Sequence, residues 1–223
     1  MMPVSSAPAG RPGAAYAAGV EIATGYGAAQ VDIDLPAMAA AFLLVLTHGA
    51  GGGTASVDLL AARDAGLRLG AVVARVTQPY RVRGARAPGS VVAQDAAWLE
   101  IIAVLRARYP GIPLVQGGRS NGARVACRTA RAAGARAVVA LAFPLHPPGR
   151  PERSRVAELR DTGTDVLVVN GARDPFGVPG GTDAARVVVL PGETHALTRD
   201  PAAVGAAVQD WLHEILGIPA AAC

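Results

Sequence analysis

The sequence predicts an α/β fold in which a mostly parallel central sheet carries helices on both faces. Two observations lead to this prediction. From Phe42 onward, short and almost wholly apolar runs alternate with longer stretches that have the length and spacing of helices, and such runs are typical of parallel strands buried on both faces. Before Phe42, apolar and polar residues alternate one by one, which indicates strands with a single buried face.

The alternating segment predicts an antiparallel hairpin at an edge of the sheet. Its strand positions are Val20, Ile22 and Thr24 before the turn and Val31, Ile33 and Leu35 after it. The turn itself is Gly25-Tyr26-Gly27. We expect residues 1–16 to be a disordered extension, because their Ala, Gly, Pro and Ser content buries little apolar surface.

The other predicted elements alternate along the chain. The apolar runs predicted as strands are Phe42 to Leu46, Val72 to Val76, Leu114 to Gln116, Ala137 to Ala142, Val166 to Val169 and Val187 to Leu190. The stretches predicted as helices are Ser56 to Leu69, Val91 to Tyr109, Asn121 to Ala133, Glu152 to Leu159 and Pro201 to Leu216. Alternation of this kind implies right-handed crossovers between parallel strands, so we expect residues 17–223 to form one domain.

Length and composition limit the class of protein. With 223 residues, 51% of them hydrophobic, the chain is long enough for one substantial core. All 21 basic residues are arginines, but they are scattered and aromatic residues make up only 4%, so we expect no nucleic-acid partner. The longest apolar run, Ala37 to Leu46, is far shorter than the roughly twenty residues that cross a bilayer. We therefore expect no membrane insertion.

Cysteine content bears on the cellular compartment. Cys127 lies in a predicted core helix and Cys223 at the end of the chain, and two such cysteines do not make a disulfide framework. We therefore expect a cytoplasmic protein. The sequence is silent on the oligomeric state.

Ser120 is the residue that most needs a chemical explanation. It is the centre of Gly118-Arg119-Ser120-Asn121-Gly122, a G-x-S-x-G pattern between a predicted strand and a predicted helix. A nucleophile elbow has this layout, because a sharp strand-to-helix reversal strains the central residue and admits only small neighbours. We expect Ser120 to be a nucleophile.

Two further candidates follow later strands. Asp174 lies in the loop after Val166 to Val169, and His195 lies in the loop after Val187 to Leu190. Reactive groups in open α/β sheets gather beyond the carboxyl ends of the strands, and Ser, Asp and His occur here in the chain order of a hydrolase triad. Asp165 opens its strand at the wrong edge of the sheet, so Asp174 is the favoured acid.

Several motifs together resemble a known family. They are THGAGGG from Thr47, QPYRVRG from Gln78, GGRSNGARVACRTA from Gly117, FPLHPPGRPE from Phe143, NGARDPFG from Asn170 and GETH from Gly192. In these motifs the chain resembles small single-domain α/β-hydrolases of the dienelactone-hydrolase type. It is closer still to bacterial hydrolases related to the hydrolase-like domain of a chromatin-associated acetyltransferase complex subunit. The resemblance covers Phe42 to about Leu216 and implies the α/β-hydrolase fold.

The three candidates have complementary roles in such a site. A serine hydroxyl is a poor nucleophile at neutral pH, so His195 removes its proton and Asp174 holds the imidazole in the required tautomer. The backbone N–H of Asn121 and an N–H near Ala50 or Gly51 are candidates for the oxyanion hole. An acyl-serine intermediate that is cleaved by water completes the expected cycle.

Three other side chains are pocket candidates with alternative interpretations. We expect His48 to order the glycine loop by hydrogen bonding, and His146, in a proline-rich loop, to shape the pocket wall rather than transfer protons. Arg119, beside the nucleophile, either favours a carboxylate-bearing substrate or is a solvated surface arginine. The histidines are dispersed and the glycine loop lacks a following G-K-[ST], so we expect no metal and no cofactor.

The expected function is hydrolysis of small soluble esters, thioesters or lactones. Between Phe143 and Val166 the sequence holds only a proline-rich loop and a short helix, which leaves little or no lid over the site, and an open site suits small substrates. Two alternatives stay open. One is a catalytically silent hydrolase-like interaction module, which a complete Ser, Asp and His set argues against. The other is an acyltransferase that uses the same three residues.

Overall fold

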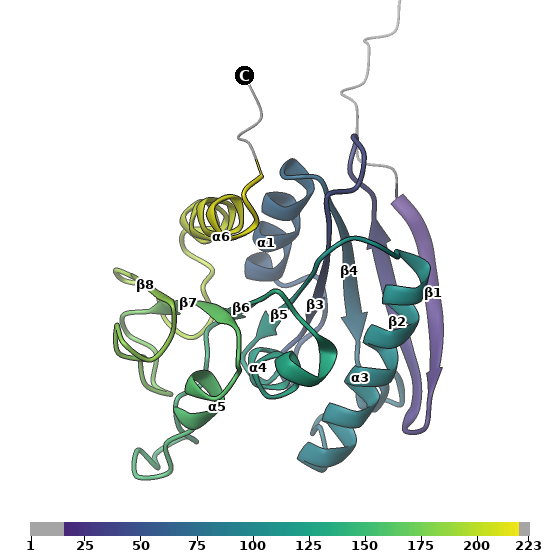
Figure 1. The fold of residues 1–223 in the computed structure, drawn as a ribbon. Coiled ribbons are helices and arrows are strands. Elements are labelled where there is room, and N and C mark those ends of the chain that lie inside the picture. The colour runs from purple at the N-terminus through teal and green to yellow at the C-terminus, as the bar shows by residue number, and fades with distance from the viewer. Residues whose placement is uncertain (1–15, 219–223) are drawn as a thin grey trace, which may run out of the picture.

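The structure of the protein is a computed structural model, and it describes residues 16–218. Within this range a single sheet has the strand order β1-β2-β4-β3-β5-β6-β7-β8 (Figure 1). The strands are β1 (Tyr16–Thr24), β2 (Gly27–Asp34), β3 (Phe42–Thr47), β4 (Ala71–Thr77), β5 (Leu114–Arg119), β6 (Ala137–Leu141), β7 (Asp165–Gly171) and β8 (Arg186–Leu190). The extension expected over residues 1–16 lies outside the described residues except for Tyr16, the first residue of β1.

The sheet is parallel from β4 to β8, and its hairpin is antiparallel. β3, β4, β5, β6, β7 and β8 pair in parallel, whereas β1 pairs antiparallel with β2 and β2 antiparallel with β4. The predicted fold class, with its antiparallel hairpin at the sheet edge, is therefore confirmed. Because the parallel strands share one direction, their carboxyl ends meet at one edge of the sheet, where the loops that carry Ser120, Asp174 and His195 lie together.

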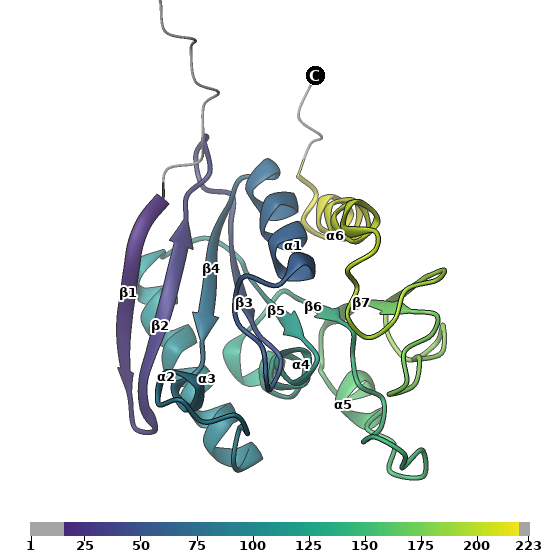
Figure 2. The same ribbon diagram turned by 180° about the vertical axis from the view of Figure 1, so that it is seen from behind.

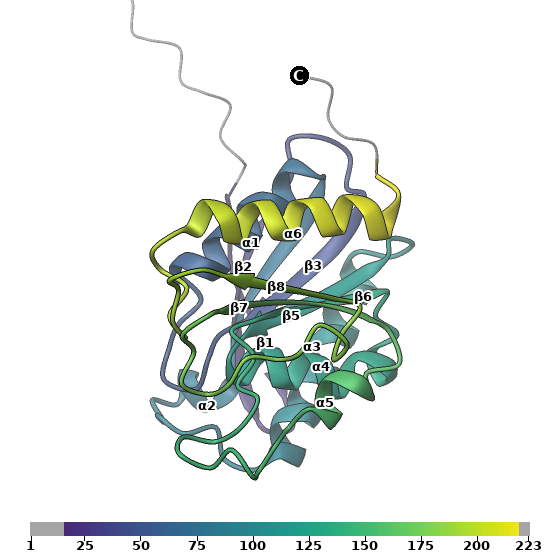
Figure 3. The same ribbon diagram turned by 90° about the vertical axis from the view of Figure 1, so that its left-hand side faces the viewer.

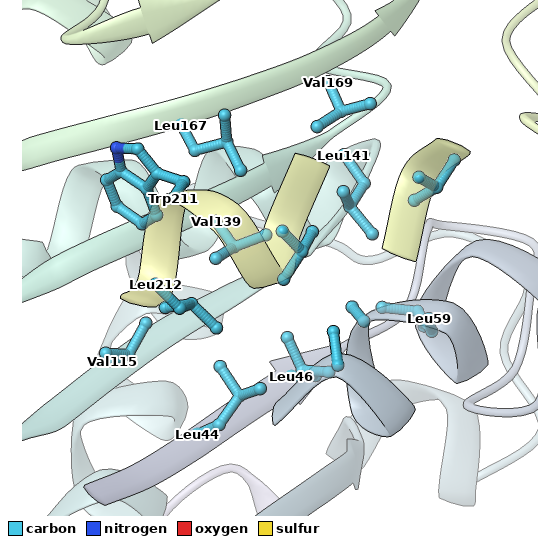
Figure 4. Close-up of a cluster of buried hydrophobic side chains, with 14 of the residues drawn as sticks. Leu44, Leu46, Leu59, Val115, Val139, Leu141, Leu167, Val169, Trp211 and Leu212 are labelled. Atoms are coloured by element: carbon cyan, nitrogen blue, oxygen red, sulfur yellow. The ribbon is translucent and has the colours of Figure 1, made fainter. Parts of the chain in front are cut away.

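Helices cover both faces of the sheet, as seen from behind and edge-on in Figures 2 and 3. The helices are α1 (Val57–Arg68), α2 (Pro79–Val82), α3 (Val91–Arg108), α4 (Asn121–Ala133), α5 (Ala157–Arg160) and α6 (Pro201–Leu216). α1 and α6 pack on one face, where Leu59 and Trp211 join Leu44 and Leu141 of the strands in a buried cluster (Figure 4). α3 and α4 pack on the other face, around Trp98 and Ile101. Apolar burial on both faces explains why the strand sequences are continuous apolar runs.

The segment between β6 and β7 differs from its prediction. A helix was expected from Glu152 to Leu159, but α5 has only one turn, Ala157–Arg160. The backbone N–H of Arg155 donates to the carbonyl of Leu145 at 2.7 Å, so the residues before α5 follow the preceding loop and do not form a helical ladder. Between β6 and β7 the only helix is therefore this single turn, in the part of the chain that the structure describes.

None of the helices within residues 16–218 is both long and apolar enough to cross a membrane.

Candidate active site

Ser120 occupies the sharp bend between β5 and α4. Its backbone has φ 53° and ψ −114°, a positive φ that costs a residue with a side chain and is held only by its surroundings. The Ser120 N–H donates to the carbonyl of Leu141 at 2.9 Å, and the Ser120 carbonyl accepts from the N–H of Arg124 at 3.2 Å. The strained conformation is therefore anchored on the neighbouring strand and on the first turn of α4.

Two glycines let the chain turn this closely. A Cβ at Gly118 would lie 2.6 Å from the Thr47 carbonyl oxygen, and one at Gly122 would lie 2.5 Å from the same oxygen. Real Cβ atoms do not approach an oxygen so closely, so the elbow and the end of β3 fit together only without side chains at these positions. The need for small residues on both sides of the serine was the reason to interpret the G-x-S-x-G pattern as a nucleophile elbow.

The three predicted catalytic side chains form one hydrogen-bonded line. The distance from Ser120 Oγ to His195 Nε2 is 2.9 Å, and the distance from His195 Nδ1 to Asp174 Oδ2 is 2.8 Å. An ionised carboxylate only accepts hydrogen bonds, so Nδ1 carries the proton and Nε2 is free to accept from the serine hydroxyl. The arrangement thus has the tautomer that a histidine base needs.

Asp174 is held in a single orientation by further donors. Its side chain is fully buried, the Phe176 N–H donates to Oδ1 at 2.9 Å, and Asn170 Nδ2 donates to Oδ2 at 3.2 Å. Neither Asn170 nor Phe176 was among the residues predicted for the site, although both lie within the same NGARDPFG motif. By contrast, Asp165 lies at the opposite end of β7, 3.8 Å from Arg136 and far from this network.

The loop that carries His195 is tied down on several sides. The Phe176 ring lies against the His195 imidazole, with 4.3 Å between ring centroids. Glu193 is buried, and its Oε1 accepts from the N–H groups of Arg199 and Asp200, both at 2.7 Å. These contacts fix the imidazole ring and join the loop to the start of α6.

Arg119 binds Asp58 and the His195 loop, two contacts that were not predicted from the sequence. Its Nε donates to Asp58 Oδ2 at 2.9 Å, and its Nη2 donates to the His195 carbonyl at 2.6 Å. Asp58 lies in the first turn of α1, and its side chain is fully buried. Two nitrogens of the guanidinium are therefore engaged by the protein, and its side chain is 18% exposed. Arg119 links the elbow, α1 and the His195 loop.

The glycine loop after β3 is ordered by two buried side chains. His48 is fully buried; its Nδ1–H donates to the Gly49 carbonyl at 2.8 Å, and its Nε2 accepts from the Gln78 N–H at 3.1 Å. Burial lowers the pKa of His48, which keeps Nε2 unprotonated as an acceptor. The Tyr80 hydroxyl donates to the Ala50 carbonyl at 3.1 Å, and burial raises its pKa to about 12.

This loop reaches the candidate nucleophile directly. A Cβ at Gly49 would lie 3.2 Å from Ser120 Cβ, so the backbone that continues into Ala50 and Gly51 starts beside the hydroxyl-bearing carbon. On the other side, Asn121 is the first residue of α4, and its Nδ2 donates to Gln94 Oε1 at 2.8 Å. Helix N-termini and turns of this kind offer N–H groups without intrahelical partners.

The remaining candidates lie at the margin of the site. His146 is half-buried, its ring Nδ1 lies 2.9 Å from the Pro147 carbonyl oxygen, and its backbone N–H donates to the Phe176 carbonyl. Cys127 is fully buried in α4, and burial raises the pKa of its thiol, so it is not available as a second nucleophile. Within residues 16–218, no cluster of three or more His, Cys, Asp or Glu side chains has the arrangement of a metal site.

Comparison with known proteins gives one family and many similar folds. The model of a family described as an alpha/beta hydrolase domain matches residues 40–193. A serine hydrolase homologue from Coxiella burnetii has a TM-score of 0.74 at 16% identity, over 87% of this chain and 97% of that chain. No curated protein sequence matches this chain significantly.

Two further solved structures are similar over most of their length. A serine hydrolase without a lid from Xanthomonas campestris has a TM-score of 0.73 at 20% identity, over 97% of this chain and 100% of that chain. Dienelactone hydrolase from Anabaena variabilis has a TM-score of 0.70 at 16% identity, over 90% of this chain and 98% of that chain. At these identities the similarity establishes a shared fold.

Proposed function

Because this chain belongs to the alpha/beta hydrolase family, we propose that it is a serine hydrolase that cleaves carboxylic esters, thioesters or lactones. The observation that carries the proposal is the unbroken line from Ser120 Oγ through His195 to the buried carboxylate of Asp174. A scaffold without catalytic activity has no physical need for a strained serine, a fixed tautomer and a buried acid in register.

The proposed reaction proceeds through an acyl-serine. Ser120 Oγ attacks the substrate carbonyl carbon while His195 Nε2 takes the hydroxyl proton, and Asp174 stabilises the resulting imidazolium. The N–H of Asn121 and an N–H of Ala50 or Gly51 stabilise the developing oxyanion. The bond to the leaving oxygen or sulfur then breaks, and His195 returns the proton to that atom.

Water completes the proposed cycle. His195 takes a proton from a water molecule as that water attacks the acyl carbon. It then gives this proton to Ser120 Oγ as the ester bond breaks and the acid is released. The substrate class follows from the open carboxyl edge of the sheet, where α5 is a single turn and no cap is present within residues 16–218. Small soluble acyl compounds reach such a site without a lid having to open.

Covalent labelling of the purified protein with a fluorophosphonate probe tests the proposal. We expect one equivalent of probe on Ser120, located by intact mass and peptide mapping, together with turnover of short p-nitrophenyl esters. Ser120→Ala should abolish both, and His195→Ala should slow the labelling by orders of magnitude while thermal unfolding shows a folded protein. Ester turnover that survives in Ser120→Ala contradicts the proposal, as does a folded wild-type protein that neither labels nor turns over ester.

A further inference from the structure

The nucleophile and the base of the proposed mechanism come from two segments that are distant in the chain. Ser120 and His195 are 75 positions apart, and 2.9 Å separates Ser120 Oγ from His195 Nε2. This hydrogen bond exists only while the serine carries its proton. In the acyl-enzyme, Ser120 Oγ is bonded to the acyl carbon and has no proton to donate. Other contacts must then keep the imidazole in place while it activates water.

Arg119 holds the main chain of the base. Asp174 binds the imidazole ring, at Nδ1, whereas Arg119 Nη2 donates to the His195 carbonyl at 2.6 Å. Arg119 also directly precedes Ser120 in the chain. A single side chain therefore extends from the backbone beside the nucleophile to the backbone of the base, and its length sets the separation of the two segments.

The guanidinium is itself held by a fixed partner, Asp58. Arg119 Nε donates to Asp58 Oδ2 at 2.9 Å, and the Leu59 N–H donates to Asp58 Oδ1 at 2.9 Å. The Asp58 side chain is fully buried, and hydrogen bonds between ionised groups are roughly twice as strong as neutral ones. Because both carboxylate oxygens have a donor, Asp58 cannot rotate without losing one of them. The first turn of α1 is thus a rigid support for Arg119.

The third nitrogen of the guanidinium lies near the glycine loop. A Cβ at Gly49 would lie 3.3 Å from Arg119 Nη1 and 3.2 Å from Ser120 Cβ. The planar group is therefore close to the glycine loop while it binds the His195 loop and α1. Arginine suits this place because its donors point in fixed directions, whereas a lysine ammonium is a point charge on a flexible stem.

We propose that Arg119 is a positioning residue: held by Asp58, it keeps the main chain of His195 at the distance from Ser120 that proton transfer requires. The inference rests on the proposed serine hydrolase function and adds a residue to it. His195 transfers a proton in both halves of that cycle, so both steps slow together when it is misplaced. A displacement of about 1 Å can lower a rate by on the order of 100-fold. Loss of the contact should therefore lower kcat by about 10- to 100-fold and leave KM nearly unchanged.

Arg119→Lys tests the proposal. The lysine keeps a positive charge for Asp58, but its ammonium does not reproduce the two donors that the guanidinium directs to Asp58 and to His195. We expect unfolding near the wild-type urea concentration, together with a fall of about 10- to 100-fold in kcat for p-nitrophenyl acetate. The rate of fluorophosphonate labelling should fall with kcat.

Arg199→Met is the matched control. Arg199 is exposed, and its Nη1 donates to the Gly192 carbonyl at 3.0 Å in the loop that carries His195. The control thus removes an arginine-to-carbonyl hydrogen bond from the same loop without touching the main chain of the base. We expect its kcat to stay within about twofold of wild type.

A double variant separates positioning from stability. Asp58→Asn combined with Arg119→Met leaves no unpaired buried carboxylate, but it also lacks the donor to the His195 carbonyl. We expect its kcat, expressed per Ser120 that labels, to stay low although urea denaturation shows recovered stability. A role in stability alone predicts the opposite result, in which kcat returns to the wild-type value as stability does.

The outcomes separate the inference from the proposed function. If both Arg119 variants fold, label at Ser120 and keep the wild-type kcat, Arg119 does not position His195, and the hydrolase function stands. A raised KM with unchanged kcat would also overturn the inference, because Arg119 would then act on the substrate. If the folded wild-type protein neither labels nor turns over any ester, the function fails and the inference fails with it.

Discussion

Arg119 joins the side chain of Asp58 to the main chain of His195, so one residue beside the serine connects α1 to the loop of the histidine. Removing it leaves the fully buried carboxylate of Asp58 without its cation. An uncompensated buried charge typically costs about 3–5 kcal/mol. We therefore predict that Arg119→Met lowers the free energy of unfolding by about 3 kcal/mol, measured by urea denaturation.

Two variants control this prediction. Asp58→Asn combined with Arg119→Met removes the unpaired charge and should recover a substantial part of the lost stability. Arg63→Met removes a pair with Asp64 whose side chains are 27% and 47% exposed, and such pairs contribute at most about 1 kcal/mol. Equal losses in Arg119→Met and Arg63→Met would show that the Asp58 contact has no special weight.

The carboxylate of Asp174 provides a second test at the level of one side chain. In Asp174→Asn, an amide N–H that faces His195 Nδ1 favours the tautomer with the proton on Nε2, which no longer accepts from Ser120. We expect kcat for a short p-nitrophenyl ester to fall by about 10³- to 10⁴-fold with the fold retained. Asp165→Asn, at the far end of β7, is the matched control and should leave kcat within about twofold of wild type.

Some residues of the site were predicted from the sequence and others were not. Ser120, Asp174 and His195 were predicted because each follows a recognisable strand, and the rule that loops gather at one sheet edge brings them together. The hydrogen bond between Arg119 and Asp58 spans 61 positions of the chain, and no local pattern reports such a contact. The same holds for Gln94, which meets Asn121 only once α3 and α4 have packed.

At the level of elements, the elbow and the end of β3 are in such close contact that no room is left for one added methyl group. Gly122→Ala would place Cβ 2.5 Å from the Thr47 carbonyl oxygen and 2.7 Å from that of His48. We predict a loss of about 1–3 kcal/mol of stability, as in other overpacked sites, and a loss of Ser120 labelling, because the glycine loop must move away.

Gly51→Ala is the control for this close contact. No heavy atom lies within 4 Å of a Cβ built at Gly51, and Gly51 is not among the glycines with positive φ. Its stability should therefore stay within about 0.5 kcal/mol of wild type, measured by thermal and urea unfolding. Stability unchanged in Gly122→Ala would contradict the packing argument.

The bounds of the helices and strands show which elements local sequence patterns predict and which they do not. α3, α4 and α6 begin and end within about one residue of their predictions, since caps and apolar spacing are local signals. β5 continues to Arg119 through Gly117 and Gly118. Its predicted end was Gln116, because glycine is disfavoured inside strands. The helix predicted from Glu152 was wrong because a contact with Leu145, outside the segment, determines its backbone path.

At the level of the whole molecule, the fold class followed from the periodicity because burial on both faces of a sheet leaves no room for polar alternation. The strand order did not follow from periodicity, since any of several orders buries the same runs. β4 lies outside β3, next to the hairpin, and this order leaves β3 beside β5. That neighbour relation places the glycine loop after β3 against Ser120, at the end of β5.

The stability of the whole chain should depend on the protonation of His48. Burial chiefly lowers its pKa, the hydrogen bond to the Gly49 carbonyl opposes this effect, and the charge of Arg81 adds to it. In the unfolded chain the same imidazole titrates near pH 6.5. Above that pH both states are neutral at His48, and below it the unfolded state takes up a proton that the folded state does not.

The free energy of unfolding should therefore fall as the pH drops below about 6.5, with a contribution from His48 of at most about 1.4 kcal/mol per pH unit. Urea denaturation between pH 7.5 and pH 5 measures the slope, and His48→Gln removes this contribution while every other side chain is the same in both proteins. A shallower slope in His48→Gln is the expected result. Equal slopes in the two proteins would mean that His48 takes up the proton in the folded state as readily as in the unfolded state. The hydrogen bond from the Gln78 N–H to His48 Nε2 would then not hold the glycine loop in place.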